Sequence, residues 1–492
     1  MEMRNLTQRL LAATLFIAVG GGSAWASVAD LRALVNTENS IEHLYTFEGA
    51  TTPDRQQDKV GSANLSVASY GSGASLSYTA GFDGTTTALT PGVTPTAGQA
   101  LTSSALTLNT SITVEALIAP DGSVGSATQY AVASGGSPTR GYFMLQREGD
   151  LKTGIGSGTF SDGDALRDYT AAYNAGDWYY TVGTYEISGG NTVFNSWVAN
   201  LSDATPTLVK TNDNVVINGT YDTTTNLGLG VFASGTAEAF NGSIDEVAVY
   251  GTTFNDFTVQ RHFSALTDTS MVIYRELFPN DTDNNQPLST DGWQINSAAG
   301  AATTTQINSP TNGTPTDVTA VNSNPDSAET ARGYLFNNDA NDVDYLAWTD
   351  EYTVNREAFE LTEISWYQSN ESTSDISRAA IEINGQWYAS DQTFQNTTTH
   401  TGAGAGELMS LDFTTATWRL LDFVDGSSLS LGSAAALPGG DISAFGVYYD
   451  SKSARLRLDT FTVSGVATAV PTPAALPAGL VLMALAIRRR SH

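Results

Sequence analysis

The strongest constraint on this chain is an alternation of apolar and polar residues that recurs along most of its length. The runs 111–118 (Ser-Ile-Thr-Val-Glu-Ala-Leu-Ile) and 454–463 show it most clearly. Successive side chains of a β-strand point to opposite faces of a sheet, so this pattern predicts strands with one buried face. Gly, Asn, Asp and Pro separate the runs about every 8–15 residues, as in antiparallel sandwiches. Helical periodicity is confined to 28–35 and 258–266, and we predict an all-β protein.

A boundary between two units is expected near 266–270, where a helical turn ends and a new strand begins. We predict two jelly-roll-like antiparallel β-sandwiches in tandem, one over residues 38–266 and one over 271–465. The length of 492 residues accommodates two such units, each with its own core. Residues 297–327 are rich in Thr, Asn, Ala, Ser and Pro, and we expect a long loop or insertion there.

Composition excludes several classes of protein. The chain has no cysteine, which excludes disulfides, Cys-ligated zinc and a thiol nucleophile. Its formal net charge is -29, with 51 Asp and Glu against 22 Lys and Arg. Such a charge repels phosphate backbones, so we expect no nucleic-acid partner.

The first 26 residues have the layout of a secretory signal peptide. Arg4 and Arg9 precede an apolar run over 10–19, and Ala24 and Ala26 form an A-x-A cleavage site. The apolar run is too short to span a hydrocarbon core of about 30 Å, which argues against a membrane anchor. We therefore predict cleavage before Ser27 and an exported protein.

The last residues, 466–492, form a linker and a tail with a proline motif, an apolar helix over 474–487 and an arginine cluster. This tail resembles the PEP-CTERM sorting signals of Gram-negative bacteria, although Val-Pro-Thr-Pro replaces Pro-Glu-Pro. The resemblance implies processing by an exosortase-type enzyme, transient inner-membrane association of a membrane-bound precursor, and a final place at the cell surface or in the extracellular matrix. An ordinary tail anchor is the alternative. The sorting residues are Val470, Pro471, Pro473, Arg488, Arg489 and Arg490.

Four stretches of the first unit are similar to strands of one family. They are 42–49, an opening strand; 112–120, in which Leu117 replaces the usual Trp; 176–185; and the closing strand 240–250 (Phe-Asn-Gly-Ser-Ile-Asp-Glu-Val-Ala-Val-Tyr). A short helix follows over 254–262. Together they resemble the LamG-like, concanavalin A-like lectin/glucanase jelly roll.

The closing strand carries a candidate metal site. Ile244 is out of phase with Val247 and Val249, which predicts a bulge at Asp245-Glu246. The family resemblance implies that Asp245 helps to hold a structural Ca²⁺ together with Glu48 or Gly49, with Asp58 as a weaker candidate. Carboxylate and carbonyl oxygens are the ligands that Ca²⁺ prefers. The alternative is that Asp245 caps backbone N–H groups or pairs with Arg261.

Two oxygen-rich runs are further candidates for a cation. Asp281, Asp283 and Asn285 have the spacing of the start of a calcium loop, but Gln286 stands where an EF-hand needs Gly and no Glu follows at the twelfth position. The second run is 337–344. Both are equally compatible with ordinary turns.

The second unit offers less. Its last run, 456–463 (Leu-Arg-Leu-Asp-Thr-Phe-Thr-Val), is similar to the strand that ends many carbohydrate-binding jelly rolls and PEP-CTERM proteins. We read the unit as a carbohydrate-binding-like sandwich.

No catalytic constellation is evident, and we expect no enzyme. A glucanase of this fold needs a Glu-x-Asp-x-x-Glu strand with paired carboxylates, and none occurs. Glu357, Glu360 and Glu363 are expected to be surface carboxylates on a strand. The histidines, His43 and His262 among them, stand in no local motif, so a triad or multi-His site is not expected. The tryptophans are expected to pack in cores and not to form sugar-stacking platforms.

The sequence thus favours an exported, non-enzymatic protein that binds an extracellular polysaccharide or a surface protein through its LamG-like domain, with Ca²⁺ as the candidate cofactor. A polysaccharide-degrading enzyme of the same fold and a purely structural matrix component are the alternatives.

Overall fold

The structure, a computed structural model, describes residues 28–70, 75–94, 97–121, 129–134, 141–147, 150–156, 165–231, 240–276, 278, 292–297, 300–301, 305–308, 334–337, 343–368, 372–397, 407–424, 428–452 and 456–468. The predicted signal peptide with Ala24 and Ala26, and the predicted sorting tail from Val470 to Arg490, lie outside these residues. So do Asp281, Asp283 and Asn285, and most of the run 337–344. The interpretation of these segments stays a prediction from the sequence.

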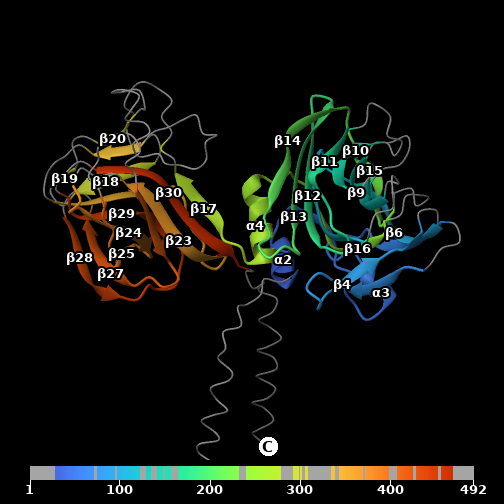
Figure 1. Cartoon of the computed structure of the whole chain (residues 1–492), viewed down its shortest axis with the longest axis horizontal. Helices are drawn as coiled ribbons and strands as arrows, with labels where there is room; N and C mark the ends of the chain where they lie inside the picture. The colour runs from blue at the N-terminus through green and yellow to red at the C-terminus, as the bar shows by residue number, and fades with distance from the viewer. Residues whose placement is uncertain are drawn as a thin grey trace, which may run out of the picture. The chain divides into compact units, whose positions relative to one another are not determined.

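The described residues form an all-β protein, as predicted (Figure 1). The chain divides into two compact units between Asp268 and Thr269, and each unit contains two antiparallel sheets. Within the described ranges, no helix has the length and apolar character needed to cross a membrane.

The first sheet of the first unit, called sheet A here, runs in the order β14-β13-β12-β7-β16-β4-β3, and β1 also pairs with β16. Its strands are β1 (Ile41–Tyr45), β3 (Ser77–Ala80), β4 (Thr87–Thr90), β7 (Ser111–Pro120), β12 (Tyr179–Ser188), β13 (Asn191–Asn200), β14 (Val209–Asn218) and β16 (Gly242–Tyr250).

The second sheet, sheet B, runs in the order β11-β10-β9-β8-β15-β6-β2, and β5 pairs with β6. Its strands are β2 (Leu65–Tyr70), β5 (Gly92–Thr94), β6 (Ala97–Thr107), β8 (Gln129–Ser134), β9 (Gly141–Arg147), β10 (Asp150–Gly156), β11 (Ala165–Ala172) and β15 (Thr224–Leu229).

The alternation in β7 decides which residues face the core of the first unit. Ile112, Val114, Ala116 and Ile118 join the buried cluster that sheets A and B share. Residues 113, 115 and 117 point to the opposite face of sheet A, which we call its outer face. A period of two therefore divides one strand between two environments.

Two helices cover the outer face of sheet A. In α2 (Val28–Val35), apolar residues at helical spacing are buried against Leu117, Tyr180 and Tyr250 of the sheet. In α4 (Asp256–Thr267), Val259 and Phe263 join the same cluster, and α2 and α4 pack against each other (Figure 1). Both predicted helical turns are confirmed, with α4 beginning two residues earlier than expected. A short helix, α3 (Thr52–Arg55), was not anticipated.

The second unit also has two sheets. Sheet C runs β20-β21-β30-β23-β26, with β17 on β30, and sheet D runs β19-β18-β22-β29-β24-β25-β27-β28. The strands are β17 (Met271–Glu276), β18 (Trp293–Ser297), β19 (Gly300–Ala301), β20 (Thr305–Asn308), β21 (Tyr334–Asn337), β22 (Val343–Thr349), β23 (Phe359–Gln368), β24 (Ile376–Ile383), β25 (Gln386–Ser390), β26 (Glu407–Asp412), β27 (Trp418–Val424), β28 (Ser428–Ala435), β29 (Ile442–Lys452) and β30 (Leu456–Ala467).

Two expectations for the second unit need correction. The stretch 297–327, expected to be loop, contains β19 and β20. The run 380–388, interpreted as one strand, is a hairpin of β24 and β25, because Asn384 and Gly385 both adopt positive φ (54° and 77°). Asn-Gly is the pair that tight two-residue hairpin turns prefer.

Tryptophan packing follows the prediction closely. Trp197, Trp293, Trp366, Trp387 and Trp418 are buried, and Trp178 and Trp348 are half-buried. The ring of Trp293 lies 5.3 Å from that of Phe461, which joins sheets D and C through an edge-to-face contact.

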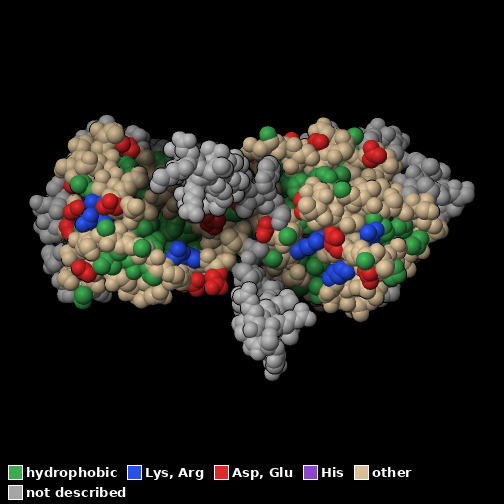
Figure 2. All heavy atoms as spheres, turned by 90° about the horizontal axis from the view of Figure 1, so that it is seen from below, with side chains coloured by type: hydrophobic (Ala, Val, Ile, Leu, Met, Phe, Trp, Pro, Cys, Tyr) green, Lys and Arg blue, Asp and Glu red, His purple; other side chains and the backbone are tan. Residues whose placement is uncertain are grey.

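Figure 2 shows one face of each unit. Uncharged polar side chains and backbone prevail there, and charged side chains occur singly or in small groups. This agrees with a chain of which only 15% is charged.

Candidate functional site

The predicted bulge in β16 is confirmed. Its pairing with β7 is regular up to Asp245↔Leu117 and resumes at Ala248↔Glu115. Glu246 adopts a positive φ of 48°. The bulge leaves two adjacent carboxyl groups in the protein interior, with Asp245 0% and Glu246 3% exposed. Buried charges require partners, so the contacts of this pair decide what the site does.

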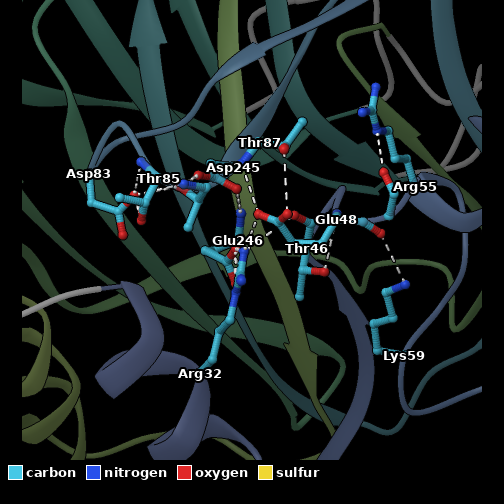
Figure 3. Close-up of polar contacts among 12 residues, drawn as sticks. Arg32, Thr46, Glu48, Arg55, Lys59, Asp83, Thr85, Thr87, Asp245 and Glu246 are labelled. Atoms are coloured by element: carbon cyan, nitrogen blue, oxygen red, sulfur yellow. Dashed lines mark hydrogen bonds and ion pairs between the residues drawn. The ribbon is translucent and has the colours of Figure 1, made fainter. Parts of the chain in front are cut away.

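Helix α2 supplies the charged partner, Arg32 (Figure 3). Arg32 Nε donates to Glu246 Oε1 at 2.8 Å, and a terminal guanidinium nitrogen contacts the same oxygen. That nitrogen also lies 3.1 Å from Glu48 Oε1. The planar guanidinium thus joins β16 to the residues that follow β1. We call Arg32, Glu48, Asp245 and Glu246 the Arg32 cluster.

The oxygens proposed as calcium ligands each accept a hydrogen bond from the protein. Glu48 Oε1 also accepts from Thr87 N at 2.8 Å, and Asp245 Oδ2 accepts from Thr86 Oγ1 at 3.0 Å. The carbonyl of Gly49 accepts from Arg55 Nε at 3.0 Å, and that of Glu48 from Lys59 Nζ at 3.4 Å (Figure 3).

Asp58, the weaker candidate for a calcium ligand, also has its carboxylate oxygens engaged in hydrogen bonds. Its carboxylate accepts from the backbone N–H of Leu44 (3.1 Å), Gly61 (2.9 Å) and Ala63 (3.1 Å) and contacts His43 Nδ1 at 2.6 Å. Burial acts to raise the pKa of Asp58, but these bonds, led by that of His43, lower it overall. Asp58 therefore holds the loop after β1 in place.

The fit to calcium can now be judged. Ca²⁺ takes six to eight oxygens whose lone pairs face the ion. Here the lone pairs of Glu48, Gly49 and Asp245 face N–H and O–H donors, and no group of three or more acidic or His side chains suited to a metal occurs among the described residues. The residues present do not fit a resident calcium ion. The alternative, Asp245 capping a backbone N–H, is what the structure contains: Glu246 N donates to Asp245 Oδ1 at 3.0 Å. Its proposed pairing with Arg261 is wrong.

Burial governs the protonation of this cluster. It raises the pKa of Asp245 to about 6, against the opposing effect of hydrogen bonds and of Arg32. It also raises the pKa of Glu246 well above its usual value, and the neighbouring Asp245 adds to this rise. Burial acts to lower the pKa of Arg32, but hydrogen bonds and charge from Glu246 raise it overall.

A second buried charge pair, which sequence reasoning missed, fixes α4. His262, which stands in no local motif of the sequence, is 0% exposed. Its Nδ1 lies 3.1 Å from Glu115 Oε2 on β7, and its Nε2 lies 3.3 Å from Glu38 Oε1. Glu38 also pairs with Arg261. We call these four residues, with Tyr180 and Tyr250, the His262 cluster.

The two tyrosines complete the surroundings of Glu115. Tyr180 donates to Glu115 Oε2 at 2.8 Å, and Tyr250 donates to Oε1. Burial acts to lower the pKa of His262, but the charges and hydrogen bonds of Glu115 and Glu38 raise it to about 9. His262 is therefore an imidazolium between two carboxylates. Because these groups are buried, they are placed to hold α4 on the sheet and not to reach a substrate.

A polar groove of about 270 Å³ lies on the outer face of sheet A beside the start of α4. We call it the β13–β14 groove. Lys210 Nζ lies 5.2 Å above the Trp197 ring and 3.1 Å from Asp256 Oδ1. Asn195 Oδ1 accepts from Asn214 N at 2.7 Å. The lining residues are Glu186, Val193, Asn195, Trp197, Lys210, Asn214, Thr253, Phe254, Asn255 and Asp256.

The second unit has a less polar groove around Arg356. Two adjoining hollows of about 610 and 550 Å³ share Arg356 and Phe413. Arg356 donates to the Pro438 carbonyl at 2.8 Å. On the face of the second unit drawn in Figure 2, hydrophobic side chains gather in a hollow that charged side chains border. Glu357 and Glu360 are exposed, and Glu363 is half-buried; Glu360 and Glu363 lie on β23 as predicted, whereas Glu357 lies in the turn before this strand.

Comparison with known proteins identifies the class of the first unit. Residues 94–260 match the family model of the concanavalin A-like lectin/glucanases superfamily. The predicted LamG-like resemblance is therefore confirmed for this segment, which contains β7, β16 and the whole β13–β14 groove. No curated protein sequence matches the chain.

Several solved structures are similar to this chain at low identity and low TM-score. A native heptameric SAP-like pentraxin from Limulus polyphemus is 16% identical, with 32% of this chain and 71% of the pentraxin covered and a TM-score of 0.23. Tailspike protein 2 of an Escherichia coli O157:H7 bacteriophage is 15% identical, with 46% and 32% covered and a TM-score of 0.32. Botulinum neurotoxin type C, in a structure concerned with its interaction with two ganglioside molecules, is 11% identical, with 87% and 99% covered and a TM-score of 0.32. At these TM-scores the likeness carries no conclusion about function.

Proposed function

We propose that this protein is an exported, non-enzymatic glycan-binding protein of the cell surface or exopolysaccharide matrix. The first unit supplies the binding domain, and the β13–β14 groove is its glycan site. Binding to a surface protein or a purely structural role in the matrix would be the outcome if no glycan is bound.

The observation that carries the proposal is the chemistry of the β13–β14 groove. Charged and amide side chains converge there, and sugar hydroxyls are recognised by such groups because each hydroxyl both donates and accepts. Lys210 and Asp256 form opposite ends of one ion pair, so the groove presents a donor and an acceptor side by side. The groove lies inside the segment that matches the lectin/glucanase family.

Two observations favour binding without catalysis. Glycoside hydrolysis uses two carboxyl groups that face the scissile bond at about 5–9.5 Å from each other. In the first unit the buried carboxyl groups of Glu115 and Glu246 are engaged with His262 and Arg32, respectively. The sequence also lacks the Glu-x-Asp-x-x-Glu strand of a glucanase.

The two ends of the chain support the location. The signal peptide over 1–26 directs export. The tail over 466–492, with its Val-Pro-Thr-Pro motif, apolar stretch and three arginines, suits recognition by an exosortase-type enzyme while the precursor is associated with the inner membrane. The resemblance of this tail to PEP-CTERM sorting signals implies an organism that makes extracellular polysaccharide, the ligand class we favour.

The test is glycan binding by the purified protein, measured on the host's own exopolysaccharide and on a panel of immobilised polysaccharides. The double variant Lys210→Met/Asp256→Asn removes the Lys210–Asp256 ion pair of the groove and leaves the net charge unchanged. We expect it to lose at least about tenfold in affinity, since each broken charged hydrogen bond costs about 1.5–3 kcal/mol. Lys59→Met, an exposed change outside the groove, is the control and should bind normally.

The possible results of this binding test distinguish the glycan-binding proposal from its alternatives. Loss of binding in the double variant but not in Lys59→Met, with both variants folded by circular dichroism, supports the groove. Binding that both variants retain moves the glycan site elsewhere, with the Arg356 groove next to be tested. Absence of binding to every polysaccharide would overturn the proposal in favour of a structural or protein-binding role.

A further inference from the structure

The Arg32 cluster holds more negative than positive charge around one cation. The guanidinium of Arg32 contacts the carboxyl groups of Glu246 and Glu48, and the carboxyl group of Asp245 adjoins that of Glu246 (Figure 3). Asp245 is 0% exposed and Glu246 is 3% exposed, so water cannot stabilise them well. An arrangement of this kind requires an internal cation, because unpaired buried carboxylates are strongly destabilising.

The geometry of Arg32 satisfies several of these oxygens at once. Besides Glu246 and Glu48, the guanidinium reaches the carbonyl of Thr46 at 3.4 Å. Its five N–H donors in one plane suit such a fork, which a compact ammonium group cannot reproduce. Arg32 therefore ties the bulge of β16 to the chain that leaves β1.

The fold seals this arrangement on the side of Asp245. A Cβ atom added at Gly81 would lie 2.3 Å from Asp245 Oδ2 and 2.2 Å from Thr86 Oγ1. A side chain at position 81 would therefore displace these atoms, and glycine lets the loop before β4 close over the carboxylate. The loop also carries Thr86, whose hydroxyl donates to Asp245 Oδ2 at 3.0 Å.

The position of Arg32 in the chain shows which element supplies the cation. Arg32 belongs to α2, which precedes the segment that matches the family, residues 94–260. Val28, Leu31 and Val35 of the same helix are buried on the outer face of sheet A. The helix is thus packed in place by its apolar face and delivers its charge into the sandwich.

We propose that Arg32 is the permanent internal cation of this domain. Its guanidinium pairs with Glu48 and Glu246 beside Asp245, where a divalent metal ion would otherwise supply the positive charge, so the domain needs α2 and no metal to close this part of the sandwich. This inference does not depend on glycan binding.

The first test uses the unaltered protein. We expect its thermal unfolding midpoint to be the same in millimolar calcium and in excess EDTA, and calcium titration calorimetry to detect no site that Asp245→Asn removes. A midpoint that falls in EDTA, together with a calcium site that Asp245→Asn abolishes, would overturn the proposal. This measurement stands even if an Arg32 variant fails to fold.

The second test removes the guanidinium. Arg32→Met keeps most of the side-chain volume, and we expect the midpoint to fall by on the order of 10 °C because the buried Glu246 carboxyl group loses its ion-pair partner. Lys59→Met removes one exposed positive charge near the same oxygens and should change the midpoint by less than about 2 °C. If Arg32→Met is no less stable than Lys59→Met, Arg32 is a surface ion pair and the proposal fails.

Discussion

The Arg32 cluster and the His262 cluster fasten two neighbouring helices to the same face of sheet A, but with different cations. In the first, Arg32 of α2 pairs with Glu246 on β16. In the second, His262 of α4 pairs with Glu115 on β7. A guanidinium stays charged at any pH that a protein experiences, whereas an imidazole can lose its proton.

Because the two cations differ in this way, the two attachments respond differently to pH. The Arg32 cluster keeps its cation as pH rises, and what titrates there are the carboxyl groups of Asp245 and Glu246, whose pKa values burial raises. The His262 cluster depends on a proton that His262 holds only up to a pH of about 9. The domain therefore joins a permanent attachment at α2 to a titratable one at α4.

The largest effect is expected from His262→Leu. It leaves Glu115 buried with two tyrosine hydroxyls as partners and no cation, and a buried ion pair with one partner removed typically loses about 3–5 kcal/mol. Urea unfolding followed by tryptophan fluorescence measures the loss. The double variant Glu115→Gln/His262→Leu, which removes the charge as well, should recover part of it. A cost of His262→Leu below that of an exposed substitution would show that the pair does not hold α4.

The second prediction concerns pH and distinguishes the two clusters directly. In the unfolded chain the pKa of His262 has its ordinary value of 6.5, whereas in the folded protein it is raised to about 9. Stability from this group is complete below pH 6.5 and is lost as pH rises to about 9. A shift of this size corresponds to on the order of 3 kcal/mol.

The free energy of unfolding at a series of pH values tests this. We expect His262→Leu to lose stability less steeply than the unaltered protein between these two pH values, because the contribution of His262 to the slope is gone. The groups that face His262 are Glu115 of β7, Tyr180 of β12, Tyr250 of β16 and Glu38, with Arg261 on the same helix. Burial raises the pKa of both tyrosines well above the usual value, so they do not titrate in this range. A slope that persists in His262→Leu would assign the titration to another group.

The smallest effect is expected at the start of α4. Asn255 Oδ1 accepts from Thr258 N at 2.9 Å and caps the helix. Asn255→Ala should cost about 1 kcal/mol, the usual value of such a cap. Thr253→Ala, in the same groove but outside the cap, is the matched control for urea unfolding. If Asn255→Ala costs as much as His262→Leu, the cap and not the buried pair determines the attachment of α4.

Much of the fold could be predicted because its signals are local. The phase break between Ile244 and Val247 indicated the β16 bulge, and the spacing of Val28, Leu31 and Val35 indicated α2. The hairpin at Asn384-Gly385 was also readable from its turn residues but was overlooked within a long apolar run. The strands of the second unit were also predicted from the alternation of apolar and polar residues.

The candidate site was predicted less well, because its contacts are not local. Arg32 lies 214 positions from Glu246, and His262 lies 147 positions from Glu115. No pattern in the sequence links such pairs. Asp245 was correctly placed at a bulge, but its partner was expected to be a calcium ion or Arg261. Arg261 instead forms an ion pair with Glu38, another member of the His262 cluster.

The sequence by itself determined the strands, their buried faces and the resemblance of the first unit, because the direction of a side chain in a strand depends on its position along the chain. Only the tertiary structure decided which cation meets which carboxylate. That choice depends on distance through space and on the loss of water around each charge, and both arise when distant strands and helices pack together. The same packing placed Lys210 above Trp197 and next to Asp256, and so produced the groove proposed to bind glycan.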